Sequence, residues 1–247
     1  MTIHAKKYGG LRLSMVVAAA LVAATAVGMP SASAVPAQEC TGTLGAVTVD
    51  RLVVPAGETC RLQGTTVNGN IVLGVGSALI TNDATVNASV RAIEGPRTVR
   101  ILDTTVTGNI RVVEATNRIV IGNAGCTVDP LAATNIQLVR NNGSIAICMM
   151  TIEENLQLFG NKGRIGVFDN NIGNNLQVQR NTDTIARFRS NVVGYDGGAN
   201  IHVFDNATDV RLRNNDFRNN LACRRNAPQP SGSGNTGTLQ GQCKDLG

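Results

Sequence analysis

Aromatic side chains are scarce in this chain. Tryptophan is absent, and phenylalanine and tyrosine together supply 3% of the 247 residues. Binding sites for small molecules are usually lined by apolar and aromatic side chains, with a few polar groups that fix orientation. The shortage of rings therefore argues against a protein that holds sugars tightly.

Long apolar runs are missing everywhere except near the N-terminus. A basic start with Lys6, Lys7 and Arg12 precedes an apolar run over residues 13–28, and the small-residue sequence "PSASA" ends at Ala34. This order predicts a signal peptide of residues 1–34. The rival interpretation, an uncleaved membrane anchor, is disfavoured because a spanning helix needs roughly 20 apolar residues. We expect a secreted, extracellular protein, in one version associated with the cell envelope, with no membrane span after cleavage.

A strongly basic surface is also missing once that segment is removed. The chain has a net charge of +5, but residues 1–34 hold three of its 22 Lys and Arg and none of its 17 Asp and Glu. The remaining chain therefore carries 19 basic and 17 acidic side chains, a balance of +2. Nucleic-acid binding requires a clustered basic face, so we expect no nucleic-acid partner.

The spacing of cysteine and histidine gives no metal motif. After residue 34 the chain keeps one histidine, His202, and one tyrosine, Tyr195, together with all six cysteines. There is no CxxC pair and no His-rich stretch, so we expect no zinc site, no other metal and no cofactor. An even number of cysteines in an exported chain predicts disulfides instead.

The chain does contain a repeat. A short aliphatic strand recurs with spacings of 19, 20, 26, 20, 20, 25 and 20 residues, after a weaker copy at Leu52; its first residues are Ile71, Val90, Ile110, Ile136, Leu156, Leu176, Ile201 and Leu221. A period near 20 residues built from strand-like units indicates a solenoid. Helical spacing is absent from residue 40 to residue 223.

Each repeat holds three short strands. The first alternates, with inward pairs such as Leu156/Leu158. The second begins at Val99, Ile119, Ile145, Ile165, Ile185 and Val210, and a third inward aliphatic follows at Val86, Val106, Ile152, Ile172, Val192 and Phe217. The pattern predicts an all-β, single-domain, right-handed parallel β-helix of eight to nine turns over residues 35–223, with the hand set by the crossover preference. Residues 224–247 are rich in Pro, Gly and Ser, and we expect a loose cap there.

Asparagine and cysteine recur at the same period. Asparagine tolerates left-handed corners, and corner amides stacked about 4.8 Å apart can pair along the axis. Two columns are predicted, one of Asn70, Asn109, Asn135, Asn155, Asn175, Asn200 and Asn220, the other of Asn141, Asn161, Asn181 and Asn206. The cysteines lie about one turn apart in pairs, which predicts the disulfides Cys40–Cys60, Cys126–Cys148 and Cys223–Cys243. The outer two would close the ends of the coil.

The segments "VDRLVVPAGETCRLQGTTVNGNI", "TTVTGNIRV" and "NNLACRRNAPQPSGSGNTGTLQGQC" carry a resemblance. The repeat pattern resembles the right-handed parallel β-helix superfamily, which includes pectate-lyase-like enzymes, tailspikes and adhesins. More closely, these segments resemble a family of secreted actinobacterial proteins of this fold, generally without an assigned activity. The resemblance implies the architecture and transfers no catalytic residue.

The outward positions of the first strand form one column. It contains Arg111, Gln137, Gln157, Gln177 and His202, and Phe159 and Phe204 face the same way two residues further on. We call this surface the first-strand face. Amide and guanidinium groups repeated every ~4.8 Å could bond an extended extracellular or cell-wall polysaccharide. The alternative is an ordinary solvated sheet face whose stacked amides hold the register.

Charged residues also line up at the first corner. They are Glu114, Arg140, Arg180, Asp205 and Arg225, with Gly160 between them. Ion pairs between neighbouring turns, worth about 0–1 kcal/mol each, explain this strip more simply than a lyase with calcium.

An enzymatic alternative centres on His202. Two long loops, residues 122–134 and 189–199, interrupt the period at one corner, and loops on one edge of a solenoid often border its working face. Tyr195 and Asp196 would then approach His202 as a general acid–base trio. The chain has no nucleophile elbow and no phosphate-binding Gly loop.

One residue conflicts with the pattern. Alternation points Arg187 inward, where a buried unpaired charge would be costly. A local bulge or a slip of register is expected, and the sequence does not distinguish them.

The leading expectation is a non-enzymatic scaffold whose first-strand face binds a polymer or partner weakly. The alternative is a polysaccharide lyase or glycoside hydrolase acting near His202. Assembly of rods through their ends is a third hypothesis, and the sequence leaves the oligomeric state open.

Overall fold

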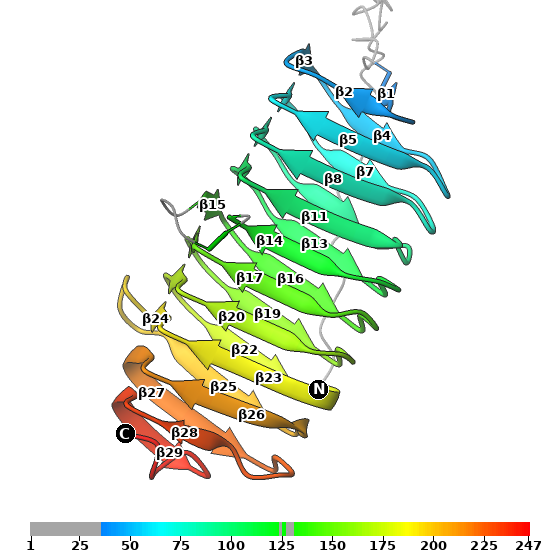
Figure 1. The fold of residues 1–247 in the computed structure, drawn as a ribbon. Helices are drawn as coiled ribbons and strands as arrows, with labels where there is room; N and C mark the ends of the chain where they lie inside the picture. Colours follow the sequence, from blue (N-terminus) through cyan, green and yellow to red (C-terminus); the bar gives the residue numbers. More distant parts are fainter. Residues whose placement is uncertain (1–35, 124, 127–130) are drawn as a thin grey trace, which may run out of the picture. The chain divides into compact units, whose positions relative to one another are not determined.

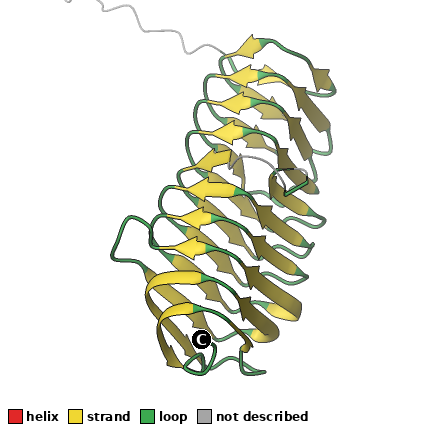
Figure 2. Cartoon of the chain, turned by 60° about the vertical axis from the view of Figure 1, so that its left-hand side comes forward, coloured by secondary structure: helices red, strands yellow, loops and turns green. Residues whose placement is uncertain are grey.

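The computed structural model describes residues 36–123, 125–126 and 131–247. In this part of the chain the backbone coils into stacked turns that follow one another along one axis (Figure 1). The described residues form strands, turns and loops but no helix (Figure 2), and so no helix there could cross a membrane. The expected signal peptide, residues 1–34, lies outside the described residues. The predicted all-β parallel β-helix is confirmed.

The first strand of every turn belongs to one parallel sheet, which we call the first sheet. Neighbouring strands pair in the register that the repeat predicts, for example Leu156 beside Leu176. The strands are β1 (Gln38–Glu39), β4 (Leu52–Val54), β7 (Ile71–Leu73), β10 (Val90–Ala92), β13 (Ile110–Val113), β16 (Ile136–Val139), β19 (Leu156–Phe159), β22 (Leu176–Gln179), β25 (Asn200–Phe204) and β27 (Asp216–Arg224).

The second strand of every turn forms the second sheet, which is also parallel. Its ten strands count the turns of the coil, slightly more than the eight or nine expected. They are β2 (Thr43–Leu44), β5 (Thr59–Gln63), β8 (Ala78–Asn82), β11 (Thr98–Leu102), β14 (Ile119–Gly122), β17 (Ile145–Cys148), β20 (Ile165–Phe168), β23 (Thr182–Arg189), β26 (Ala207–Arg213) and β28 (Ser231–Ser233).

Shorter strands make the third side of the coil. They are β3 (Thr48–Val49), β6 (Thr66–Val67), β9 (Thr85–Val86), β12 (Thr105–Val106), β15 (Leu131–Ala133), β18 (Met150–Ile152), β21 (Asn171–Ile172) and β24 (Val192–Val193). The last four join the first sheet through β27, which runs unbroken where earlier turns have two strands.

The C-terminal segment corrects the expectation of a loose cap. Its β28 pairs in parallel with β26, and β29 (Thr236–Gly241) pairs in parallel with β27. The segment therefore adds strands to the coil although it is rich in Gly, Pro and Ser. Composition misled here because backbone hydrogen bonds to a preformed edge stabilise a strand whatever its side chains.

The inward side chains fill the coil with one continuous aliphatic core. The inward residues of the first strand, among them Leu156, Leu158, Leu176 and Val178, are at most 1% exposed. Full burial of such a side chain stabilises the fold by roughly 1.5–3 kcal/mol. Because each turn presents the same few positions to the interior, the side chains of successive turns stack directly.

One extra residue in β23 resolves the conflict at Arg187. The register shifts between Thr182 and Ile185, where two residues of β23 lie opposite one residue of β26. Beyond this bulge Ala186 and Phe188 face the core, and Arg187 is exposed.

The same insertion moves the following inward position of the third side by one residue. Val193, not the expected Val192, pairs with Ile172 and is buried. A single bulge thus accounts for both departures from the predicted alternation.

Asparagine amides link the turns at the corners, as predicted. In the buried first-corner ladder the Asn161 Nδ2 donates to Asn181 Oδ1 at 3.1 Å and the Asn181 Nδ2 donates to Asn206 Oδ1 at 3.0 Å. The same Nδ2 atoms also donate to backbone carbonyls, for example Asn181 to Leu158 at 3.0 Å. Each amide therefore satisfies polar groups that the turning backbone leaves inside.

A second buried ladder was not predicted. Asn170, Asn191, Asn215 and Asn235 are at most 4% exposed, and each Nδ2 donates to the Oδ1 of the next. The period of this ladder varies, at 21, 24 and 20 residues, because the bulge and the second long loop fall between its members.

The C-terminal segment ends both buried ladders. Gln242 Oε1 accepts hydrogen bonds from Asn226 N at 2.8 Å and Asn226 Nδ2 at 3.0 Å, as the next asparagine would. The Leu246 carbonyl does the same for Asn235 Nδ2 at 2.7 Å. The segment therefore supplies the missing acceptors of a further turn.

The three predicted disulfides are confirmed. The Cα atoms lie 5.3 Å apart in Cys40–Cys60, 5.6 Å apart in Cys126–Cys148 and 5.4 Å apart in Cys223–Cys243. No described cysteine is free. The first and last disulfides tie the terminal turns to their neighbours, where a solenoid has contacts on one side only.

Replacing Asn181 with alanine should lower the free energy of unfolding by roughly 2–5 kcal/mol, because it leaves the Leu158 carbonyl and the Asn161 backbone amide buried without partners. The matched control is Asn155→Ala in the half-buried ladder, where water can replace the amide, with a loss below about 1.5 kcal/mol. Chemical denaturation measures both. Equal losses in the two variants would contradict the role of the buried ladder.

Candidate functional site

The first-strand face is assembled as predicted. Strand pairing places Arg111 beside Gln137, then Gln157, Gln177 and His202, each on the next turn. The second column also forms, with Phe159 beside Gln179 and Gln179 beside Phe204. This order follows from the constant two-residue alternation of the strands.

The three glutamine side chains bond one another. Gln137 Nε2 donates to Gln157 Oε1 at 2.8 Å, and Gln157 Nε2 donates to Gln177 Oε1 at 3.3 Å. All three are half-buried. The ladder fixes the amides in one orientation and uses part of their hydrogen-bonding capacity for the register of the sheet.

The column ends in a small stack of rings. The His202 and Phe204 rings lie 4.7 Å apart with an interplanar angle of 20°, and the Arg224 guanidinium lies 4.3 Å from the Phe204 ring centre. Phe204 is 8% exposed. The stack is therefore a flat, partly apolar platform next to the glutamine amides, and cation–π attraction holds Arg224 over it.

The stack lowers the pKa of the His202 imidazole from its ordinary value. Burial is the larger cause, because it disfavours the charged ring, and the Arg224 charge adds to it. His202 is consequently neutral over a wider range of pH than an exposed histidine.

The structure does not join Tyr195 or Asp196 to His202 by a hydrogen bond among the described residues. Tyr195 lies in a shallow groove on the third side with Thr151, Asn171 and Arg218. The loop that carries it, beside β24, projects from the stack of turns (Figure 1). Burial and the Asp196 and Glu153 carboxylates raise the Tyr195 pKa, so its phenol is a poorer base at neutral pH. Asp196 is exposed, and its backbone amide bonds the carbonyl of Gly173 in the turn before.

The charged strip at the first corner forms ion pairs, as expected. Arg140 Nη2 lies 2.8 Å from Glu114 Oε1, and Arg225 Nη2 lies 3.0 Å from Asp205 Oδ2. Arg225 also lowers the Asp205 pKa, chiefly by this hydrogen bonding. No salt bridge joins Arg180 to Asp205 within the described chain.

The corner geometry explains why Gly160 belongs to the strip. All six positions have φ between 51° and 60°, the left-handed region, in which glycine is unstrained.

Sequence reasoning missed a cluster on the second sheet. The bulge in β23 turns Arg187 and Arg189 outward, beside Arg211 and Arg213 of β26. The signal was present as the repeated "RFR" and "RLR", but the unbroken alternation assigned Arg187 to the core. Its geometry is described below.

Comparisons of the chain with protein-family models, with curated proteins and with solved structures found no match. The fold shown by the structure is that of a parallel β-solenoid. Among the described residues no group of three or more His, Cys, Asp and Glu is placed to hold a metal ion.

His202 should titrate with a pKa below its ordinary value of about 6.5, and its single imidazole signal in protein lacking residues 1–34 can be followed by NMR. The unfolded chain then takes up the proton before the folded chain, so folding stability falls as pH drops through the folded pKa. His202→Gln should remove this loss. Arg224→Gln should raise the pKa partway, since burial remains. A pKa at or above the ordinary value would contradict the arrangement.

Proposed function

We propose that the chain is a secreted, non-enzymatic β-solenoid scaffold whose first-strand face binds an extracellular polysaccharide weakly. The observation that carries the proposal is the in-register column from Arg111 through three bonded glutamines to the ring stack at His202. Donors and acceptors held in fixed positions lose little conformational entropy when a ligand binds. A scarcity of exposed rings keeps the affinity low.

Two further features support this proposal. Six cysteines paired within the chain are typical of an oxidising, extracellular compartment, in agreement with the predicted signal peptide and with the exported actinobacterial proteins that the sequence resembles. The groups predicted for acid–base catalysis do not converge, since Tyr195 lies on the third side and His202 on the first sheet. A repeated surface suits a repeated polymer better than a single reaction centre.

Binding can be measured by retention of the purified protein on insoluble cell-wall polysaccharides. Replacing Gln157 and Gln177 together by alanine should weaken retention at least about fivefold, because two central amides are lost. The matched control is Gln63→Ala, an exposed glutamine on the second sheet, which should change retention less than twofold.

Two outcomes would overturn the proposal. Equal retention of the Gln157/Gln177 variant and the control would show that the first-strand face does not bind. Release of new reducing or unsaturated ends from these polysaccharides, abolished by His202→Ala, would establish the enzymatic alternative.

A further inference from the structure

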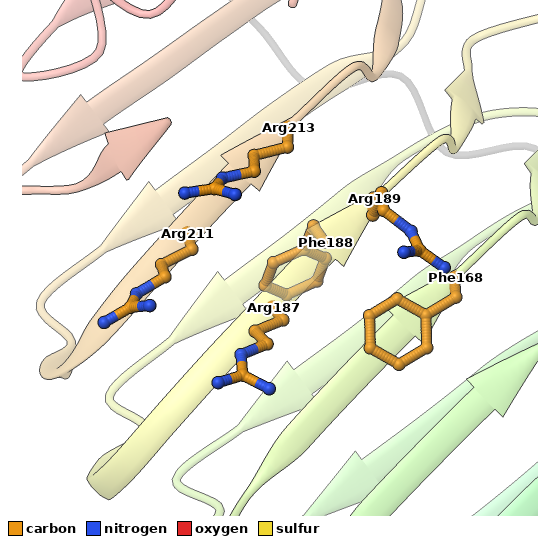
Figure 3. Close-up of a pocket in the computed structure, with 6 residues that line it drawn as sticks. All are labelled: Phe168, Arg187, Phe188, Arg189, Arg211 and Arg213. Atoms are coloured by element: carbon orange, nitrogen blue, oxygen red, sulfur yellow. The ribbon is translucent and has the colours of Figure 1, made fainter. Parts of the chain in front are cut away.

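A pocket on the outer face of the second sheet presents four arginines. It is lined by Phe168 of β20, by Arg187, Phe188 and Arg189 of β23, and by Arg211 and Arg213 of β26, and its volume is ≈ 290 Å³. We call it the arginine pocket. Figure 3 shows the four guanidinium groups on two neighbouring strands, with the Phe168 ring on the next strand beside Arg187 and Arg189.

The arginines form two bays. Strand register places Arg187 directly beside Arg211, and Arg189 directly beside Arg213. Neighbouring strands lie about 4.8 Å apart, so the two cations of each bay can share one anion. Alternate residues of a strand are about 6.6 Å apart, which is therefore the spacing between the bays.

The chain's own carboxylates neutralise this charge only in part. Arg211 Nη2 lies 2.6 Å from Asp209, and Arg189 Nη2 lies 4.0 Å from Asp169. Arg187 and Arg213 make no ion pair with any described residue. Each bay thus keeps one uncompensated guanidinium, and two like charges this close favour an added anion.

Phe168 forms an apolar wall on one side of the bays. The Arg189 guanidinium lies 5.4 Å from its ring centre. The ring folds back over Gly166, where an added Cβ would come within 2.6 Å of ring atom Cε2. The glycine therefore makes room for the ring next to Arg187, and the wall excludes water from one side and strengthens the ion pairs. On the other side Ser231 and Ser233 of β28 continue the two columns and leave the pocket open.

The bulge is what brings this cluster together. Without the extra residue before Ile185, alternation would turn Arg187 and Arg189 toward the core. A departure from the repeat that displays two arginines, both in register with two more, is unusual for a surface that serves only solubility.

We propose that the arginine pocket binds an extended acidic peptide segment of a partner protein, with carboxylates at alternate positions. Alternate side chains of an extended peptide lie about 6.6 Å apart on one face, which matches the spacing of the bays. Each carboxylate enters one bay and accepts charge-assisted hydrogen bonds from two arginines, whose planar guanidinium groups suit carboxylate oxygens. The pocket lies on the second sheet and does not depend on the polysaccharide proposed for the first-strand face.

The test compares two synthetic peptides of identical composition, Ser-Glu-Thr-Glu-Ser and Ser-Glu-Glu-Thr-Ser, by NMR titration of the full folded protein. The alternating peptide should bind at least tenfold more tightly, because adjacent glutamates of an extended chain face opposite sides and fill one bay. Its affinity should fall as NaCl is raised. Equal affinities, or no binding of the alternating peptide at millimolar concentration, would overturn the proposal.

The variants are matched by position. Arg187→Gln combined with Arg213→Gln should weaken the alternating peptide at least tenfold. Arg61→Gln occupies the same outward column six strands away and should change the affinity less than twofold. Gly166→Ala should weaken binding severalfold by displacing the Phe168 ring, while the strand tolerates alanine, as at Ala146 of the preceding turn. Unchanged thermal unfolding shows that each variant folds.

Two other polyanions decide the class of partner. Hyaluronan oligosaccharides and single-stranded oligothymidylate should bind more weakly than the alternating peptide, since neither has its carboxylate spacing. Tighter binding of either would overturn the peptide assignment. Loss of peptide binding in the Gln157/Gln177 variant would show that the first-strand face, not the arginine pocket, is the site.

Discussion

The coil depends on the satisfaction of backbone polar groups at its corners. Strand hydrogen bonds link the turns along the sheets, but at each corner the chain bends and its amides and carbonyls leave the ladder while still buried. Asparagine solves this problem twice in every turn of the C-terminal half, once near Asn181 and once near Asn191. The aliphatic core supplies the driving force, and the amides determine where each turn must bend.

Much of this architecture could be predicted because a solenoid repeats each constraint. The period of about 20 residues, the inward aliphatics, one buried asparagine ladder and all three disulfides follow from spacing alone. Each prediction was supported by several copies, so an error at one turn would have conflicted with its neighbours. The C-terminal turn escaped because its strands rest on backbone pairing, with little side-chain pattern to reveal them.

The register of β23 could not be predicted for a related reason. In "TIARF" the alternation permits either Ile185 or Ala186 as the first inward residue, and hydrophobicity favours the wrong one. Only the buried Phe188, two positions after Ala186, restores the pattern. The candidate site shows the same limit: columns such as Gln137 to His202 were predictable from period, whereas the direction of the Tyr195 loop depends on contacts that no repeat encodes.

The two surfaces proposed for binding differ in how much freedom they retain. The glutamines of the first-strand face are tied to one another, which makes that face regular and stiff. In the arginine pocket, Arg187 and Arg213 have no ion-pair partner among the described residues, so their guanidinium groups are free to adjust to an incoming anion. A regular face suits weak contact repeated along a polymer, and an adjustable pocket suits recognition of one short segment.

The way the C-terminal segment ends the ladders has a consequence for the length of such proteins. Gln242 and the Leu246 carbonyl each meet the asparagine of the turn before, and that asparagine is the same in every turn of this half. Whole turns could therefore be duplicated or lost upstream while the terminus continued to close the stack unchanged. Gene length in such a lineage would be free to vary in steps of one coil.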